Sequence, residues 1–182
     1  MLVTGISGAG KSTALAELAR RGHRIVDTDY GGCSEEVQGT GAGVGEQLWV
    51  EDRIEALLEG CEPGVTFISG CVSNQGRFYP RFDAVVLLTA PASVLLERVA
   101  GRETNQFGKR DAERSRILDD LTRIEPLLRA SATAEIDTRA PLGEVVDALE
   151  TIADRVLRPM RTSRPDRPPG RHGHGVSGES RP

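Results

Sequence analysis

The chain has 182 residues, of which 38% are hydrophobic and 27% are charged, and this length fits one α/β domain with a sizeable core. No apolar run approaches the ~18 to 20 residues that a membrane helix needs, and Met1 leads directly into structured-looking sequence. We therefore expect a cytoplasmic protein with no membrane partner. The formal net charge of −4 combines +4 on residues 158–182 with −8 on residues 1–157. Because a nucleic-acid backbone binds a basic face, an acidic domain disfavours a nucleic-acid partner.

Short apolar runs of strand length alternate with longer amphipathic ones along residues 1–157. Strands are expected at residues 2–4, 23–26, 65–69, 84–88 and 134–137. Helices are expected at residues 11–21, 46–59, 91–100, 111–131 and 141–157, the fourth bent at Pro126. Strands separated by helices pair in parallel through right-handed crossovers, so the fold class is α/β, a three-layer α/β/α sandwich. The Pro- and Gly-rich residues 158–182 have too little apolar surface to fold and are expected to form a disordered basic tail.

A glycine-rich motif lies between the first strand and the first helix. Residues 5–12 read GISGAGKS and match G-x-x-x-x-G-K-[ST] at every fixed position. Glycines let backbone N–H groups approach phosphate oxygens, and the start of the helix adds positive potential. Lys11 supplies a charge to the outer phosphates and Ser12 a hydroxyl ligand for Mg²⁺. The motif predicts a nucleotide site formed by Gly8, Ala9, Gly10, Lys11, Ser12 and Thr13.

The nucleotide could serve a small-molecule kinase, a GTPase switch or a mechanical ATPase. A GTPase normally reads guanine with N-K-x-D, and this pattern does not occur. A mechanical ATPase usually carries an Asp-Glu pair after a strand, whereas the strand at residues 65–69 is followed by Gly70 and Cys71. These absences favour phosphoryl transfer to a bound acceptor over hydrolysis.

Three segments together resemble the nucleoside monophosphate and shikimate kinase group of P-loop small-molecule kinases, which are adenylate-kinase-like ATP-binding proteins. They are the motif at residues 5–12, the D-T-D at residues 27–29, and E-R-V-A-G-R at residues 97–102. The resemblance covers about residues 1–155. It implies a five-stranded parallel sheet, ATP and Mg²⁺ as cofactors, and a kinase domain over residues 1–157 with a mobile lid at about residues 101–110.

The resemblance also implies roles for single residues. Arg98 would pack over adenine and Arg102 would reach the transferring phosphoryl group. Their spacing of four residues lets both project from one helix face. Asp27 would help to hold hydrated Mg²⁺, and Asp29 would orient the acceptor hydroxyl. The loop that contains Arg139 corresponds to the adenine-binding loop of related kinases.

The motifs do not identify the molecule that accepts the phosphoryl group. Residues 30–52 contain no Lys or Arg, and Arg53 follows them, with Arg77 and Arg81 as further cations that could compensate. An acidic segment repels a phosphate monoester and favours a neutral or cationic hydroxylated acceptor. A nucleoside monophosphate kinase and a nucleotide-binding ATPase or regulatory module remain alternatives. Ser73, Asn74 and Gln75 are candidate acceptor contacts, Trp49 is expected in the core, and the protein is expected to be a monomer or a homodimer.

Overall fold

A parallel five-stranded sheet forms the centre of the molecule. The computed structural model describes residues 1–38, 45–61, 64–102 and 107–162, with side chains to residue 157. The strand order is β2-β5-β1-β6-β7, and every neighbouring pair is parallel. Its strands are β1 (Leu2–Thr4), β2 (Arg24–Asp27), β5 (Thr66–Ser69), β6 (Val85–Thr89) and β7 (Ala134–Asp137). A separate antiparallel hairpin, β3 (Ser34–Gln38) and β4 (Gly45–Trp49), stands beside this sheet.

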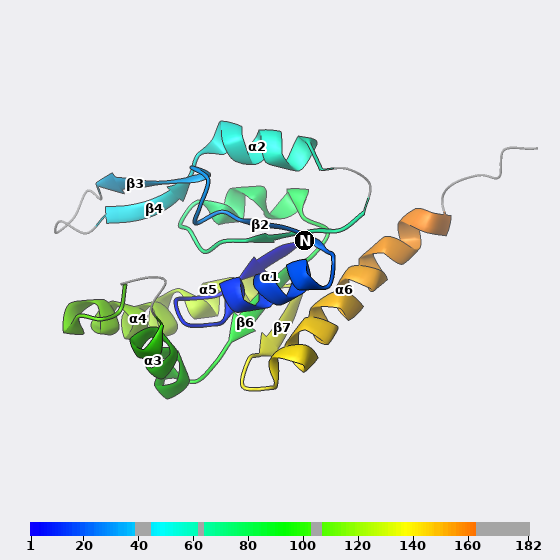
Figure 1. The fold of residues 1–182 in the computed structure, drawn as a ribbon. Helices are drawn as coiled ribbons and strands as arrows, with labels where there is room; N and C mark the ends of the chain where they lie inside the picture. Colours follow the sequence, from blue (N-terminus) through cyan, green and yellow to red (C-terminus); the bar gives the residue numbers. More distant parts are fainter. Residues whose placement is uncertain (39–44, 62–63, 103–106, 163–182) are drawn as a thin grey trace, which may run out of the picture.

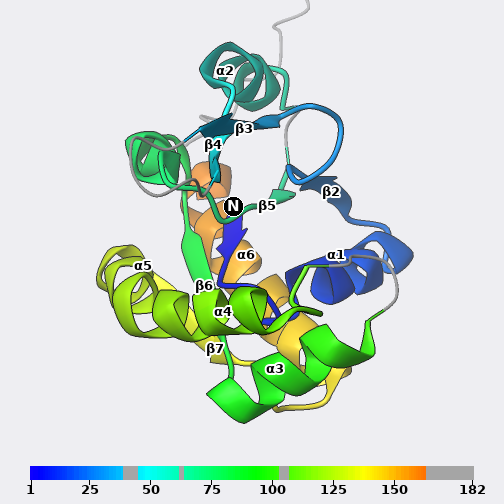
Figure 2. The same ribbon diagram turned by 90° about the vertical axis from the view of Figure 1, so that its left-hand side faces the viewer.

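Helices cover both faces of the central sheet (Figure 1). They are α1 (Lys11–Arg20), α2 (Glu51–Glu59), the 3₁₀ segment η1 (Gln75–Arg81), α3 (Ala92–Gly101), α4 (Asp111–Arg123), α5 (Glu125–Ser131) and α6 (Leu142–Thr162). In Figure 2, α1 and α6 lie on one side of the sheet and η1 and α5 on the other, while α4 crosses in front of the strands. This arrangement confirms the predicted α/β/α sandwich.

Apolar burial on both faces explains why the central strands form. All residues of β1, β5 and β6 are buried, and α1 buries Ala14, Leu15 and Leu18 against the sheet. On the same side of the sheet, α6 contributes Val146 and Leu149, both at 0% exposure. Burying one such side chain contributes about 1.5–3 kcal/mol, so the main cluster dominates the stability of the sheet.

A second, smaller cluster packs α2 and η1 against the central sheet. It joins Trp49, Ile54 and Phe78 to Leu2 of β1 and Val85 of β6. The rings of Trp49 and Phe78 meet edge to face at 5.5 Å. Trp49 is therefore a core residue, as the sequence predicted, and it places the hairpin next to the edge of the sheet.

The structure differs from the expected elements at three places. The helix predicted over residues 46–59 is wrong in its first part, because β4 ends at Trp49 and α2 begins only at Glu51. The helix predicted over residues 111–131 divides into α4 and α5, with Pro126 in the first turn of α5, where its missing N–H costs nothing. The last helix continues past residue 157 to Thr162, and residues 163–182 lie outside the described part.

No helix in the described part of the chain is both long and apolar enough to span a bilayer.

Candidate active site

The glycine-rich loop turns sharply between β1 and α1. Gly5, Gly8 and Gly10 have φ angles of 149°, 86° and 95°, a region that residues with a Cβ rarely adopt. A Cβ on Gly8 would meet the Leu95 carbonyl oxygen at 2.7 Å. The loop thus passes directly against α3, and its close approach is possible only without a side chain at this position.

Lys11 spans the loop from the first residue of α1. Its Nζ donates to the Gly5 carbonyl oxygen at 2.6 Å and lies 3.5 Å from that of Ile6. The ammonium group is therefore held over the loop that would surround the phosphates. A bound phosphate offers stronger, charged acceptors than these two carbonyl groups.

Ser12 and Asp27 supply oxygen atoms beside the loop. The Ser12 hydroxyl donates to Asp27 Oδ2 at 3.1 Å, which joins the first turn of α1 to the end of β2. A hydroxyl and a carboxylate are hard oxygen ligands of the kind Mg²⁺ prefers. Among the described residues no group of three or more His, Cys, Asp and Glu side chains could enclose a metal. Ser12 and Asp27 thus bring two oxygen ligands of this kind together at the end of β2.

Asp29 follows the same strand and lies near the cations of the site. Its backbone N–H donates to Asp27 Oδ1 at 3.2 Å. The residue is exposed, yet protein atoms around the carboxyl group limit its hydration and raise its pKa. Lys11 and Arg102 oppose this rise, and Asp27 adds to it. Asp29 thus shares one electrostatic environment with Lys11 and Arg102, although their positions in the sequence are far apart.

Arg98, in the last turn of α3, connects two segments of the site. Arg98 donates to the Thr138 hydroxyl at 2.7 Å and to the Thr138 carbonyl at 2.6 Å, and reaches the Gly8 carbonyl at 3.4 Å. It thereby ties the glycine-rich loop to the segment after β7.

Arg102 lies just past the end of α3, on the side of Asp29. Its Nη2 donates to the Phe107 carbonyl at 3.0 Å. Its Nε is buried and has no hydrogen-bond partner in the described part of the chain. A buried donor without a partner is costly, so an anion that accepts from it would be stabilised there.

Arg139 has its own local partner. Its Nε donates to Asp137 Oδ2 at 2.8 Å, and this contact lowers the pKa of Asp137. The side chain is 62% exposed. The loop itself does reach the site through Thr138, whose Cβ is 3.9 Å from the position of a Cβ on Gly10.

The first part of the chain matches a protein-family model. The model describes an AAA domain and matches residues 1–119, which is more than half of the chain. The chain belongs to this AAA-domain family. A search of curated protein sequences gave no match.

Solved kinase structures share the fold of this AAA-domain protein. Shikimate kinase from Bacteroides thetaiotaomicron is 20% identical, with a TM-score of 0.55 over 84% of this chain and 97% of that one. Gluconokinase from Sinorhizobium meliloti is 20% identical, with a TM-score of 0.52 over 90% and 96%. Deoxyadenosine kinase from M. mycoides, solved with dATP, is 12% identical, with a TM-score of 0.51 over 85% and 100%. The resemblance to the P-loop small-molecule kinases is confirmed at the level of the fold.

Two of the expected acceptor contacts have structural partners instead. The Asn74 amide accepts from the Trp49 N–H and donates to the Trp49 carbonyl, both at 2.9 Å. Gln75 is 2% exposed, and its amide nitrogen donates to the Thr4 hydroxyl at 3.2 Å and the Tyr79 hydroxyl at 2.9 Å. The contacts fix the hairpin and η1, so these two amides do not face an acceptor.

Two residues next to the site were not singled out from the sequence as site residues. Cys71 follows β5; burial raises its pKa, while Lys11, Thr4 and Gly5 lower it. Asp120 on α4 is near enough for its charge to raise the pKa of Cys71 further. Cys71 could have been noticed from its position after a predicted strand, where parallel sheets bind ligands. Nothing in the local sequence around Asp120 indicates that it comes near this edge.

Proposed function

We propose that this protein is a kinase that transfers the γ-phosphoryl group of ATP, bound with Mg²⁺, to a hydroxyl group of a small molecule. The observation that carries the proposal is the unpartnered, buried Nε of Arg102 beside Asp29 and Lys11. A carboxylate beside these cations can orient either water or an acceptor hydroxyl, and the absence of an Asp-Glu pair directly after the strand at residues 66–69 favours the acceptor. A carboxylate there suits the orientation of an acceptor hydroxyl.

The nucleotide would be bound by backbone N–H groups and side chains of residues 8–13. On binding, Lys11 would exchange the Gly5 carbonyl for the outer phosphates. Ser12 and Asp27 would hold Mg²⁺, which reduces the repulsion between the phosphates and an incoming oxygen. Arg98 would support the loop after β7 on the adenine side, and Arg139 would adjoin it.

Transfer requires that the acceptor oxygen and the γ-phosphate meet in line. The acceptor oxygen forms a bond to the γ-phosphorus while the bond from that phosphorus to the β–γ bridging oxygen breaks, and ADP leaves. The hydroxyl proton passes to Asp29 or to water. Arg102 and Lys11 stabilise the charge on the transferring group, because both are donors fixed beside it.

The segment at residues 101–110 would form a lid over the phosphates. Lys109 Nζ donates to the Ala100 carbonyl at 2.5 Å and the Arg102 carbonyl at 2.6 Å, which stabilises the base of this segment. Residues 103–106 lie outside the described part. We further propose that residues 1–157 form the kinase domain and act in the cytoplasm, as a monomer or a homodimer.

The proposal is tested by ADP release with ATP, Mg²⁺ and panels of hydroxyl compounds, nucleosides and nucleotides. At least one acceptor should raise ADP release above the basal rate; if none does, the chain is a nucleotide-binding ATPase or regulatory module instead. Lys11→Ala should weaken ATP binding at least ~10-fold through loss of a charged donor. Asp29→Asn should lower kcat by about 10²-fold or more with the KM for ATP nearly unchanged.

Arg20→Ala is the matched control for Lys11→Ala, since Arg20 lies on the same helix, α1, but faces solvent. It should retain wild-type turnover. An Asp29→Asn enzyme that loses ATP affinity as strongly as turnover would assign this carboxylate to the metal or to the fold instead.

A further inference from the structure

Helix α4 presents one side to the hairpin. Arg116 Nη2 donates to the Gly45 carbonyl, at the start of β4, at 3.2 Å. Ile117 is fully buried and fixes the rotation of the helix against the core. Asp120 comes one turn after Arg116 and therefore lies on the same side. In Figure 2 this helix crosses in front of the strands, between the hairpin and α3.

Helix α4 carries a half-buried carboxylate, Asp120. Its side chain makes no hydrogen bond or ion pair within the described ranges, although Arg116 is close enough to affect its charge. Its charge also reaches Cys71, which itself lies beside Gly5 and Lys11. Asp120 thus approaches the glycine-rich loop from α4, while Asp29 approaches it from β2.

Three arginines around the hairpin and η1 bind other groups of the protein. Arg53 Nη1 donates to the Gly32 carbonyl at 2.6 Å, and Arg116 is bound to Gly45 as described. Arg77 forms an ion pair with Glu51. None of these three guanidinium groups is therefore free. The same side of the molecule carries the carboxylates of Asp29 and Asp120.

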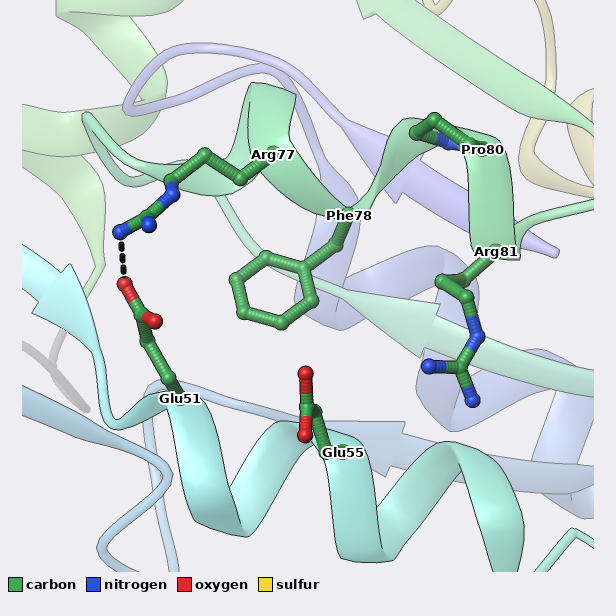
Figure 3. Close-up of a pocket in the computed structure, with 6 residues that line it drawn as sticks. All are labelled: Glu51, Glu55, Arg77, Phe78, Pro80 and Arg81. Carbon is green, nitrogen blue, oxygen red and sulfur yellow. Dashed lines mark hydrogen bonds and ion pairs between the residues drawn. The ribbon is translucent and has the colours of Figure 1, made fainter.

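Arg81 faces a separate hollow of about 300 Å³ between α2 and η1 (Figure 3). The residues that line it are Glu51, Glu55, Arg77, Phe78, Pro80 and Arg81. Neither the glycine-rich loop nor Asp27 or Asp29 belongs to this lining. Arg81 therefore lines the hollow, and none of Arg53, Arg77 and Arg81, the cations that could compensate an acidic acceptor side, is directed to the acceptor.

We propose that Asp120 binds a positively charged group of the acceptor, so that the substrate is a hydroxylated amine, an amino sugar or an amino alcohol. The proposal rests on the proposed kinase function. Asp29 orients the hydroxyl that receives the phosphoryl group, and Asp120 pairs with the ammonium group on the opposite side. A phosphate ester or a sugar acid would face the carboxylates of Asp29 and Asp120 and is disfavoured.

The test compares three acceptor sets of equal size: amino sugars and amino alcohols, their neutral hydroxyl counterparts, and the corresponding acids. The wild-type protein should have a kcat/KM for one amine at least ~10-fold above its neutral counterpart. Asp120→Asn should abolish this preference, chiefly through a higher KM for the amine, with the KM for ATP unchanged. Asp120→Glu, which keeps the charge, should retain part of the preference.

Asp119→Asn is the matched control, because Asp119 is the exposed acid next to Asp120 on α4. It should keep the wild-type preference. A neutral or acidic acceptor that is used better than its amine would overturn the inference and leave the kinase proposal intact. A preference for the amine that survives in Asp120→Asn would also overturn the inference. If acceptors of every charge fail to raise ADP release, the kinase proposal fails, and the inference fails with it.

Discussion

Gly8 and Gly22 share a backbone conformation but differ in their surroundings. Their φ angles are +86° and +89°, so a side chain strains the backbone equally at both positions. A Cβ on Gly22 would meet nothing within 4 Å, whereas one on Gly8 would overlap the backbone of Leu95. The conformational cost and the packing cost of the glycine-rich loop can therefore be separated by experiment.

We expect Gly22→Ala to lower the free energy of unfolding by about 1 kcal/mol, the cost of a left-handed residue with a Cβ. Gly8→Ala adds the overlap with α3 and should cost about 3 kcal/mol or more. Urea unfolding of both variants measures the difference. Equal losses in the two variants would mean that the loop moves freely away from α3.

At the scale of elements, the β3–β4 hairpin depends on contacts outside itself. Its two strands pair with each other and with no strand of the central sheet in the described part. Trp49 is 2% exposed and its Nε1 donates to the Thr28 hydroxyl at 2.8 Å. Asn74 satisfies both backbone groups of the same residue. The hairpin is thus fixed mainly at the end of β4.

Asn74→Ala should destabilise the protein by about 2 kcal/mol, because it removes two hydrogen bonds to buried backbone groups. Trp49 is the only tryptophan of the chain, so its fluorescence reports directly on this anchor. We expect a shift toward solvent-exposed emission at a lower urea concentration than in the wild type. Ser73→Ala is the control: the Ser73 side chain is exposed, and its backbone N–H, which donates to Gln47, is unchanged. Equal behaviour of the two variants would contradict the anchor.

The elements differ in how far the sequence alone predicts them. The strands of the sheet and the glycine-rich loop were predictable, because buried apolar runs and the G-x-x-x-x-G-K-S pattern are local signals. The hairpin was missed, since Glu35, Glu36 and Glu46 have low strand propensity and its pairing depends on the distant Asn74. The proximity of Asp29 to Arg102 was expected from the resemblance. The proximity of Asp120 to Cys71 was not expected, because it follows from the path of α4 across the sheet edge.

At the scale of the whole molecule, Arg21 connects the two ends of the described chain. Its Nη1 donates to Asp147 at 2.6 Å and to Glu150 at 2.7 Å, both on α6, and its Nε donates to Glu17 at 3.1 Å. Arg20 also pairs with Glu17 but is 73% exposed. Arg21 thus holds α1, which carries Lys11 and Ser12, against the last helix of the fold.

Arg21→Ala should lower the thermal midpoint by ~2 °C or more, because it breaks a network that joins two helices, whereas Arg20→Ala should change it little. Since the network is partly exposed, the difference between the variants should shrink as salt rises toward about 1 M. Thermal unfolding in low and high salt measures both effects. A loss that is independent of salt would show that Arg21 stabilises the helix pair by packing of its aliphatic stem. If both variants behave alike, α6 is held by its buried apolar side chains, among them Val146 and Leu149, without help from the Arg21 network.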